Sequence, residues 1–454
     1  MAFAHQRAKY DIVIDTDCGI DDFRALTYFM ALRDFNINAI STVGGVLDAE
    51  TSAKCVSSLL CDFHHEGIML QLGQNAKSFK KNCQCANDFW QNIHNQSLPI
   101  CENAVYDAIM NNDKQTVFVA LGPLTNLASL VENHPELLSK ISYVLWSAEY
   151  GDKGVTGFNY GMDERAYEKV VASGLKVRIV AAEKSEYPSD FLDFVKEIKT
   201  PYARTFSDLY KEKSIEKESL CDDILPFYIL YPEFFAEKLV SSNISLITPK
   251  SDTQFDILAT RILNSVETEK GVIMTEMPRA GYLLSTDVEP IASTLIEKYG
   301  YTEFKLVLLT SEMHSHLGIY SIIGAKLGLR ILEYLHVGLD EISVESNAGS
   351  MPPLSCLNDG LQIGAGTTMG YGAIKISDEK NVNPSVIVTY NGQKFLFKLK
   401  DSVVAEISAD VQSLVAKYGL ESDVYWSEIR RLSIEKYWLC KSRFDIFEVE
   451  QQSR

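Results

Sequence analysis

"YDIVIDTDCGIDDF", Tyr10 to Phe23, places four aspartates directly behind an apolar run. "DIVID" is typical of a buried strand, and "DDFRALTYFMAL" begins with two acids and continues as a helix. Four like charges so close together repel one another. Solvation of an ordinary surface loop gives no reason to set them behind a buried strand, so we expect the aspartates, Asp15, Asp17, Asp21 and Asp22, to have a specific role.

The first 250 residues alternate short β-rich runs with helical patterns. The strands predicted here are "DIVID", "INAISTVG", "TVFVALG", "ISYVLW" and "KVRIVAA", separated by helices such as "AETSAKCVSSLLCDF" and "LTNLASLVENH". Continuous apolar strands that alternate with helices predict an α/β fold, a mostly parallel sheet flanked by helices. Ligands bind at the carboxyl ends of the strands in such sheets, and the acid cluster falls at one of those ends.

The pattern changes after about residue 305. "HLGIYSIIGAKLGLRILEYL" predicts a long helix of small and apolar residues, and "PSVIVTYNGQKFLFKLK" predicts a β-hairpin turned by Asn391-Gly392. Before it, "FDILATRILNSVETE" and "EPIASTLIEKYG" also predict helices. At 454 residues the chain exceeds what one hydrophobic core usually holds. We therefore predict two domains, residues 1–304 and a smaller α+β domain over residues 305–454.

The composition excludes several classes of partner. A formal net charge of −18 argues against nucleic acid, because nucleic-acid binders need a cationic surface. There is no apolar run of about 18 residues, so we expect no membrane-spanning segment, and the start of the chain shows no apolar signal core. These observations predict a cytoplasmic protein that acts on a cation or a small molecule.

The nine cysteines are scattered, which favours reduced thiols over a disulfide framework. One cluster stands out, the "CQC" of Cys83 and Cys85, with Cys101 and the pair His64 and His65 nearby. Its spacing fits no standard zinc site, so we favour free thiols over zinc binding there.

Three explanations of the acid cluster remain open from the residues alone. Carboxylates that converge after a strand are tolerated where a hard cation, Ca²⁺ or Mg²⁺, neutralises them. An acidic helix N-terminus would explain Asp21 and Asp22 but would leave Asp17 without a role. Finally, "DxD" after a strand is the haloacid dehalogenase pattern, in which the first aspartate is a phosphoryl nucleophile.

Four stretches, in order, resemble the inosine–uridine-type nucleoside hydrolase family. "DTDCGIDD" is similar to its "DxDxGxDD" motif, and "VALGPLTNLASLVENHPELLSKISYVLW", from Val119, is similar to its "GPLTN" segment. "GFNYGMDERA", from Gly157, and "CDDILPFYILYPEFF", from Cys221, are similar to its "EFNxxxDPEA" and "HDPxAxAYLxDPxxF" segments. The resemblance covers roughly residues 10–300. A dehalogenase would show none of the last three stretches.

This resemblance implies a Ca²⁺ ion bound by three carboxylates and one backbone carbonyl, from Asp17, Asp22, Asp222 and Leu121. Asp17 would also be the general base for water on the ion, and Asp21 and Asn159 would bind ribose hydroxyls. The implied reaction is hydrolysis of the N-glycosidic bond of a nucleoside or related ribosyl compound. Carboxylates near the sugar would stabilise its oxocarbenium-like transition state. The family is commonly oligomeric, so a homo-oligomer is expected.

Three positions depart from the family pattern. Gly157 replaces a glutamate that contacts the ribose 5′-hydroxyl, Val46 replaces an asparagine after the second strand, and Cys221 replaces a histidine that helps to protonate the leaving base. A thiol with a pKa of about 8.5 is a poor substitute for an imidazolium. Each lost contact is worth about 1.5–3 kcal/mol. We therefore expect altered sugar and leaving-group recognition, with a catalytically weak nucleoside- or metal-binding protein, a sensor or carrier, as the alternative.

A second constellation lies in the C-terminal part of the chain. "MHSHLGIYSIIGAKLG" contains His314 and His316, and "PPLSCLNDGLQIGAGTTMGYGAIKI" contains Cys356 and Asp359. Two histidines and a distant cysteine could bind Zn²⁺ or another transition metal, with Asp359 nearby. On spacing alone, a structural histidine pair is an equal alternative.

The same two stretches resemble the formylmethanofuran dehydrogenase E-like family, whose pattern is "FHGHLxPxxxxGxxMG" followed by "CxxDxIQxxxGCTxGKGN". Thr367 and Tyr371 replace the cysteine and the lysine of the last segment. The resemblance implies an α+β metal-binding domain, and it does not extend to redox chemistry.

Overall fold

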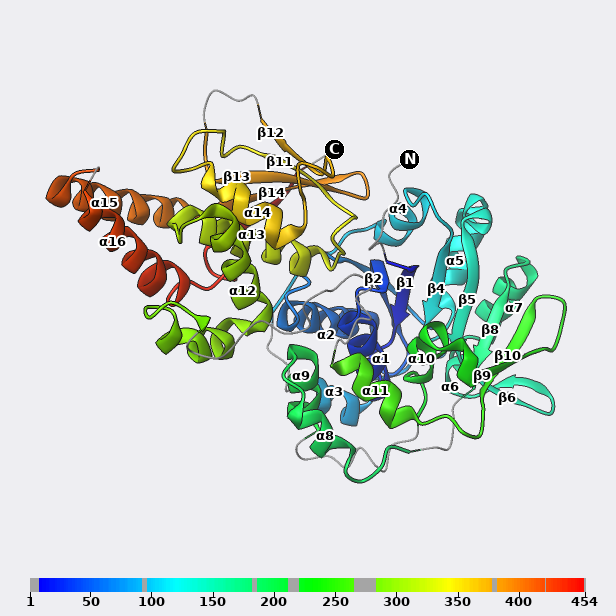
Figure 1. Cartoon of the computed structure of the whole chain (residues 1–454). Coiled ribbons are helices and arrows are strands. Elements are labelled where there is room, and N and C mark those ends of the chain that lie inside the picture. Colours follow the sequence, from blue (N-terminus) through cyan, green and yellow to red (C-terminus); the bar gives the residue numbers. More distant parts are fainter. Residues whose placement is uncertain are drawn as a thin grey trace. The chain divides into compact units, whose positions relative to one another are not determined.

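The structure, a computed structural model, describes residues 8–91, 96–181, 186–210, 220–264, 283–377, 382–420 and 422–452 (Figure 1). The chain divides between residues 269 and 270 into two compact units. We call the described residues before this division the N-terminal unit and those after it the C-terminal unit.

One large sheet forms the centre of the N-terminal unit. Its strands are β1 (Tyr10–Thr16), β2 (Phe35–Gly44), β3 (Met69–Asn75), β4 (Thr116–Ala120), β5 (Ile141–Ser147), β8 (Val177–Val180), β9 (Phe235–Leu239) and β10 (Ile244–Pro249). They pair in the order β3-β2-β1-β4-β5-β8-β10-β9, and every pair is parallel except β10 with β9. The predicted α/β fold with a mostly parallel sheet is confirmed. The strands β3, β9 and β10 were not predicted, because polar residues interrupt their apolar pattern.

The helices of this unit cover the sheet. They are α1 (Ile20–Ala31), α2 (Ala49–Asp62), α3 (Gln84–Trp90), α4 (Ala104–Met110), α5 (Thr125–Asn133), α6 (Phe158–Met162), α7 (Glu164–Ala172), α8 (Phe191–Glu197), α9 (Pro201–Leu209), α10 (Ile224–Leu230) and α11 (Phe255–Leu263). Two 3₁₀ turns, Pro135–Ser139 and Pro232–Phe234, and a small hairpin of β6 (Glu149–Gly151) and β7 (Gly154–Thr156) complete the unit. The end of the helix predicted as "FDILATRILNSVETE" lies outside the described residues.

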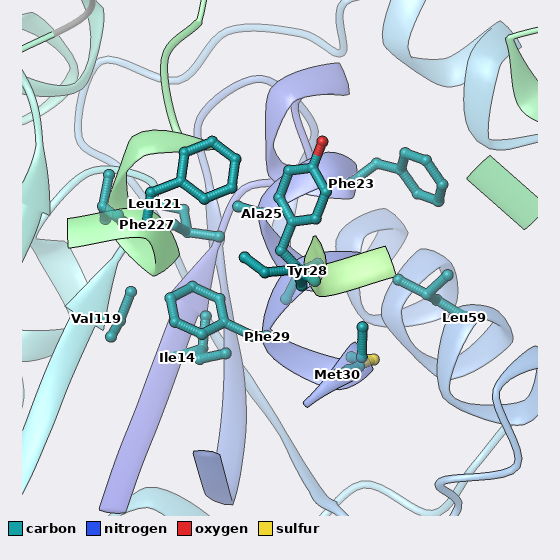
Figure 2. Packing of buried hydrophobic residues seen from close by; sticks show 14 of the residues in the cluster. Ile14, Phe23, Ala25, Tyr28, Phe29, Met30, Leu59, Val119, Leu121 and Phe227 are labelled. Carbon is teal, nitrogen blue, oxygen red and sulfur yellow. The ribbon is translucent and has the colours of Figure 1, made fainter. Parts of the chain in front are cut away.

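Alternate residues of each central strand enter different halves of the core. Ile12 and Ile14 of β1 pack in the cluster that contains α1, α2 and α9 to α11, whereas Val13 packs in the cluster of α4, α5 and α7. Figure 2 shows the first cluster, in which Phe29 of α1 lies with Ile14 and with Val119 of β4. Strands that are buried on both faces need apolar residues in succession, which is the pattern of "DIVID" and "TVFVALG".

The strand order reverses between β1 and β4. Successive strands run outward from β1 through β2 to β3 on one side, and from β4 through β5 and β8 on the other. Asp15 of β1 is opposite Ala120 of β4, so the two strands end together. Helices that leave such a reversal point diverge to opposite faces and leave a crevice for a ligand. Asp17 and Leu121 stand at this point.

The C-terminal unit has a smaller sheet and a helical layer. Its elements are a 3₁₀ turn (Glu289–Ile291), α12 (Ala292–His314), α13 (Ile319–Leu335), β11 (Ser343–Ser346), α14 (Cys356–Ala365), β12 (Ile374–Ile376), β13 (Ser385–Tyr390), β14 (Gln393–Leu399), α15 (Asp401–Tyr418), α16 (Asp423–Leu432), a π-helical turn (Ser433–Trp438) and β15 (Phe447–Gln452). The strands pair in the order β12-β11-β13-β14-β15, with β11 and β12 parallel and the others antiparallel. The predicted α+β class is confirmed.

Two predicted features of this unit are also present. The hairpin of β13 and β14 turns at Asn391 and Gly392, whose φ angles of 45° and 73° are those of the expected Asn-Gly turn. The long helix of small residues is α13, and its glycines allow α14 to approach closely. A Cβ atom on Gly324 would lie 2.1 Å from the carbonyl oxygen of Leu357, and one on Gly360 would lie 2.1 Å from that of Ser321.

The predicted domain boundary at 304/305 requires correction, because it falls inside α12. Leu295 and Phe304 of this helix are buried in one cluster with Ile322 and Trp438 of the C-terminal unit. The apolar face of α12 therefore belongs to the core of the C-terminal unit, and the division lies before residue 283.

Among the described residues, no helix is long and apolar enough to span a bilayer.

A buried ion pair ties two distant segments of the N-terminal unit. Arg24 of α1 donates from Nε and Nη2 to the two carboxylate oxygens of Asp223, at 2.7 and 2.8 Å, and from Nη1 to the hydroxyl of Tyr210 at 3.0 Å. The side chains of Arg24 and Asp223 are 1% and 0% exposed. Tyr187 also donates to Asp223, at 3.3 Å. The pair therefore fastens the segment before α10 to the helix that carries Asp21 and Asp22.

We expect Arg24→Met to lower the free energy of unfolding by about 3–5 kcal/mol, because it leaves Asp223 charged, buried and without its cation. Urea unfolding of the full chain, followed by circular dichroism, measures this loss. Lys169→Met is the matched control, since the pair of Lys169 with Glu132 is exposed and contributes little. Equal effects of the two substitutions would contradict the role of the buried pair.

Candidate functional site

A pocket lies at the carboxyl ends of β1, β4 and β5 in the N-terminal unit. Its lining consists of Asp17, Asp21, Asp22, Val46, Leu121, Ser147, Ala148, Glu149, Phe158, Asn159, Cys221 and Asp222. Of the nine residues to which the family resemblance assigns a role or a departure, eight are in this set, and the ninth, Gly157, directly precedes Phe158. The fold thus brings together the four separate stretches that carry the family resemblance.

Three carboxyl groups converge in this pocket. Ligand oxygens of Asp21, Asp22 and Asp222 all lie within 4.8 Å of one another, and Asp22 and Asp222 are buried. Burial raises the pKa of Asp22, and hydrogen bonds with Thr16 and Asp222 offset part of this rise. Buried carboxyl groups that lie this close together mark a place where a cation can bind.

The carboxyl groups titrate at unusually high pH. Burial, and then the charge of Asp22, raises the pKa of Asp17 well above its ordinary value and that of Asp21 to about 6. Burial, and then the charge of Asp21, raises the pKa of Asp222. The described lining offers no cationic side chain against these acids. An all-oxygen donor set with this excess of negative charge fits a hard divalent cation such as Ca²⁺.

The backbone around Asp17 holds its side chain in one place. Its Oδ2 accepts a hydrogen bond from the backbone N–H of Val46, at 2.8 Å. A Cβ atom on Gly45 would lie 2.0 Å from the same oxygen, and one on Gly122 would lie 3.1 Å from Cγ of Asp17. Asp17 lies beside the group of three carboxyl groups rather than within it. Its assignment as a metal ligand therefore remains a prediction.

The acidic N-terminus of α1 explains Asp22 in part. Its oxygens accept hydrogen bonds from the backbone N–H groups of Asp17, at 3.2 Å, and Gly19, at 3.0 Å, and from the hydroxyl of Thr16. The same carboxyl group still lies in the pocket with Asp21 and Asp222. Asp22 therefore both accepts hydrogen bonds at the N-terminus of α1 and contributes a carboxyl group to the pocket.

The dehalogenase explanation does not fit the structure. Its nucleophile would be Asp15, which is fully buried and outside the pocket lining. Oδ1 of Asp15 accepts hydrogen bonds from Ser41, at 2.5 Å, and Asn126, at 2.8 Å. Burial raises the pKa of Asp15 to about 7. Asp15 therefore links β1 to β2 and α5 rather than facing a substrate.

Asn159 presents one defined atom to the pocket. Its amide nitrogen donates to two backbone carbonyls, those of Leu121 at 2.6 Å and Ser147 at 3.0 Å. Both amide hydrogens are used in this way, so Oδ1 is the atom that can accept a hydrogen bond from a sugar hydroxyl. The bond to Leu121 also orients the carbonyl that the resemblance implied as a metal ligand.

The three departures from the family pattern have distinct structural consequences. Val46 acts through its backbone, which holds Asp17. Gly157 has a φ of 95°, and a Cβ atom there would lie 2.9 Å from Cγ of Glu149, so this side chain occupies the space over the glycine. Burial, and then the charge of Asp21, raises the pKa of the Cys221 thiol. Cys221 is therefore an even weaker acid here than a free thiol.

Four further lining residues were not predicted from the sequence, namely Ser147, Ala148, Glu149 and Phe158. The first three directly follow or end β5, so the rule that ligands bind at the carboxyl ends of parallel strands would have found them. Phe158 stands at the phenylalanine of the "EFN" segment in the stretch "GFNYGMDERA", but no role was predicted for it. Its position is decided by the β6–β7 hairpin, which leads the chain back to the pocket before α6.

In the C-terminal unit, the structure brings the two histidines and Asp359 together. Nδ1 of His314 lies 2.6 Å from Oδ2 of Asp359, and the rings of His314 and His316 are 4.3 Å apart. Nε2 of His314 is buried and has no hydrogen-bond partner. Cys356 is one turn before Asp359 on α14, but among the described residues its sulfur does not join a three-ligand group with the histidines.

The cysteines are free, as the scattered pattern predicted. The sulfur atoms of Cys83 and Cys85 lie 2.8 Å apart near the start of α3. His65, which the sequence placed near them, instead contacts the hydroxyl of Tyr202 at 2.8 Å. Among the described residues, neither Cys83 nor Cys85 belongs to a group of three metal-ligating side chains.

We expect a divalent cation to raise the thermal midpoint of the wild-type chain, because it relieves the repulsion among the pocket carboxylates. At 100 times its Kd the gain is about 2.7 kcal/mol. Thermal unfolding with and without Ca²⁺ or Mg²⁺ measures it. Asp222→Asn should abolish the response, whereas Asp113→Asn, in an exposed loop, should retain it. If neither Ca²⁺ nor Mg²⁺ changes the thermal midpoint of the wild-type chain, the prediction of a divalent-cation site is contradicted.

Two protein-family models match the chain. The family model "Inosine-uridine preferring nucleoside hydrolase" matches residues 12–283, and the model "FmdE, Molybdenum formylmethanofuran dehydrogenase operon" matches residues 313–438. Non-specific ribonucleoside hydrolases RihC from Klebsiella pneumoniae and Salmonella paratyphi B are 27% and 28% identical over 183 and 184 residues. Each alignment covers 37% of this chain and 60% of the relative, so the chain spans less than two thirds of these relatives.

Among solved structures, an inosine-uridine preferring nucleoside hydrolase from Bacillus anthracis is similar, with a TM-score of 0.48 and 14% identity. A purine-preferring ribonucleoside hydrolase from Gardnerella vaginalis gives 0.47 and 14%. Both alignments cover 57% of this chain and 100% of the other. The first family model covers more than half of the sequence, including every residue of the carboxylate pocket. The chain therefore belongs to the inosine-uridine preferring nucleoside hydrolase family, and an FmdE-like region follows its nucleoside hydrolase region.

Proposed function

We propose that the N-terminal unit is a calcium-dependent hydrolase that cleaves the N-glycosidic bond of a ribonucleoside or a related ribosyl compound. The observation that carries this proposal is the convergence of Asp21, Asp22 and Asp222 in a pocket that also contains Asp17 and Asn159. The names of the curated relatives, which are ribonucleoside hydrolases, support the same reaction class.

Asp22 and Asp222, with Asp17 and the carbonyl of Leu121, would bind the cation. When bound, Ca²⁺ supplies a Lewis acid that lowers the pKa of water and offsets the charge of the buried carboxylates. The rest of the chemistry belongs to the side chains. Asp17, held through Oδ2 by Val46, accepts a proton from the attacking water.

Two residues would position the sugar. Asp21 is half-buried at the start of α1 and can accept hydrogen bonds from ribose hydroxyls. Asn159 offers Oδ1, since its amide hydrogens are donated to the backbone. As the C1′–N bond lengthens, positive charge develops on the ring, and the surrounding carboxylates stabilise it. This gives the acid cluster a use in the transition state as well as in cation binding.

We expect Asp17→Asn to lower kcat by about 10²–10⁴, the usual contribution of a general base. Release of ribose from a panel of ribonucleosides, measured with Ca²⁺ present, tests this. Asp113→Asn serves as the control because it removes the same charge from an exposed loop. Calcium content, determined for each variant by elemental analysis, separates a lost base from a lost ion.

The alternative, a catalytically weak nucleoside- or metal-binding protein, makes a different prediction. In that case the wild-type chain would bind Ca²⁺ and release no ribose from any member of the panel. That result would overturn the hydrolase proposal.

For the C-terminal unit we propose a transition-metal site, Zn²⁺ being the simplest occupant. The buried Nε2 of His314 lacks a partner, whereas Nδ1 contacts Asp359. A carboxylate on one ring nitrogen, with the other nitrogen left for a metal, is the usual arrangement around metal-binding histidines. His314, His316 and Cys356 would then be ligands, and Asp359 would orient His314.

We expect His314→Ala to abolish the stoichiometric transition-metal content of the purified chain, and Asp359→Asn to weaken the affinity by about 10–100-fold. Elemental analysis and a competitive chelator titration measure the two effects. His134→Ala is the control, since His134 is an exposed histidine of the N-terminal unit. Unchanged metal content in His314→Ala would leave a structural histidine pair as the explanation.

A further inference from the structure

We propose that the preferred substrate of the carboxylate pocket is a cationic N-glycoside, in which a pyridinium or an N-alkylated purine is attached to the sugar. This inference rests on the proposed hydrolytic function and adds the substrate class. Three features of the described lining point to it, namely its charge, its rim and the weakness of its acidic groups other than the carboxyl groups.

The charge of the lining favours a positive substrate. Five carboxyl groups, those of Asp17, Asp21, Asp22, Asp222 and Glu149, line the pocket, and its described lining includes no lysine, arginine or histidine. One divalent cation offsets two of these charges, so a negative potential remains. The chain as a whole carries a formal charge of −18, which attracts cations over a longer range. A substrate with a positive base is therefore favoured over a neutral one, and a phosphorylated substrate is disfavoured.

The rim of the pocket is suited to a flat cation. Phe158, the first residue of α6, is 54% exposed although it is a large aromatic side chain. Glu149, in β6, occupies the space over Gly157, the residue directly before Phe158. The pairing of Glu149 with Thr156 in the β6–β7 hairpin holds it in register there. An aromatic face together with a carboxylate is the chemistry that binds aromatic cations, through cation–π attraction and charge.

The third feature concerns the leaving group. A neutral nucleoside expels its base as an anion unless an acid protonates the base. Apart from carboxylates, the described lining offers only Ser147, Asn159 and Cys221 as side chains with a proton on a heteroatom. A hydroxyl, an amide and a thiol are weak acids at neutral pH. A cationic N-glycoside needs no acid at this step, because its base departs as a neutral molecule.

The balanced reaction is a simple hydrolysis. The C1′–N bond breaks, and its electron pair passes to the ring nitrogen, which loses its positive charge. A water oxygen forms the new bond to C1′, and one water proton passes to Asp17 and then to the solvent. The products are the free sugar, a neutral base and a proton, and no oxidant or reductant takes part.

A matched substrate series tests the inference on the purified full chain with Ca²⁺. N-Ribosylnicotinamide and 7-methylguanosine, under conditions in which both are cations, are compared with uridine and guanosine. Because cationic glycosides also hydrolyse faster without enzyme, each kcat/KM is divided by the rate of spontaneous hydrolysis. We expect the corrected values of the cationic substrates to exceed those of the neutral ones by at least about tenfold.

Substitutions at the rim add a readout that a general loss of structure would not produce. Glu149→Gln and Phe158→Leu should raise KM for the cationic substrates by about tenfold and should raise KM for guanosine by a clearly smaller factor. Glu168→Gln and Phe194→Leu are the matched controls, because both residues are exposed and lie outside the pocket lining. The controls should leave both KM values unchanged.

The outcomes distinguish the substrate class from the reaction itself. Corrected values that favour the cations, with a selective effect of the rim substitutions, support the inference. Cleavage of guanosine or uridine at corrected rates equal to or above those of the cations overturns the inference and leaves the proposed hydrolase function standing. An absence of cleavage of all four compounds, with calcium bound, overturns both.

Discussion

The buried pair of Arg24 and Asp223 is the interaction on which the candidate site depends. Asp223 is adjacent to Asp222, and Arg24 is on the same helix as Asp21 and Asp22. Without a cation, the carboxyl groups of these two segments repel each other. The bidentate contact, buried and supported by Tyr187 and Tyr210, holds the segments together despite that repulsion. The ion pair thus offsets the electrostatic repulsion among the buried carboxyl groups of the pocket.

The same site relies on small residues for its close approaches. Gly45 and Gly122 leave room for Asp17, and Gly157, at a φ of 95°, leaves room for Glu149. At each of these positions a Cβ atom would meet a functional side chain. The departure at Gly157 therefore removes one carboxylate from the family pattern and admits another from β6. The rim of the pocket therefore differs from the family pattern, whereas the aspartates Asp17, Asp21, Asp22 and Asp222 match it.

Much of the fold followed from local patterns. Uninterrupted apolar runs such as "DIVID" predicted strands buried on both faces, and Asn391-Gly392 predicted the hairpin, since both signals arise from a few neighbouring residues. The boundary at 304/305 was wrong because the apolar face of α12 fits either core equally well on the sequence. Only its packing against Ile322 and Trp438 shows to which core it belongs. The strand β3 was missed because polar side chains interrupt its apolar pattern; Gln71 accepts a hydrogen bond from the backbone of α4, and Gln74 contacts Ser129 of α5.

By itself, the sequence determined the type of the elements with a clear apolar pattern, the acid cluster after the first strand and the identity of most pocket residues, because these signals arise from short stretches of neighbouring residues. The tertiary structure decided which carboxyl groups share the pocket. It grouped Asp21 with Asp22 and Asp222, set Asp17 beside them and turned Asp15 away. It also decided that Glu149 and Phe158 form the rim and that Asp359 contacts His314. Each of these contacts joins segments that are far apart in the chain. They are therefore set by the packing of the folded units and not by local sequence preference.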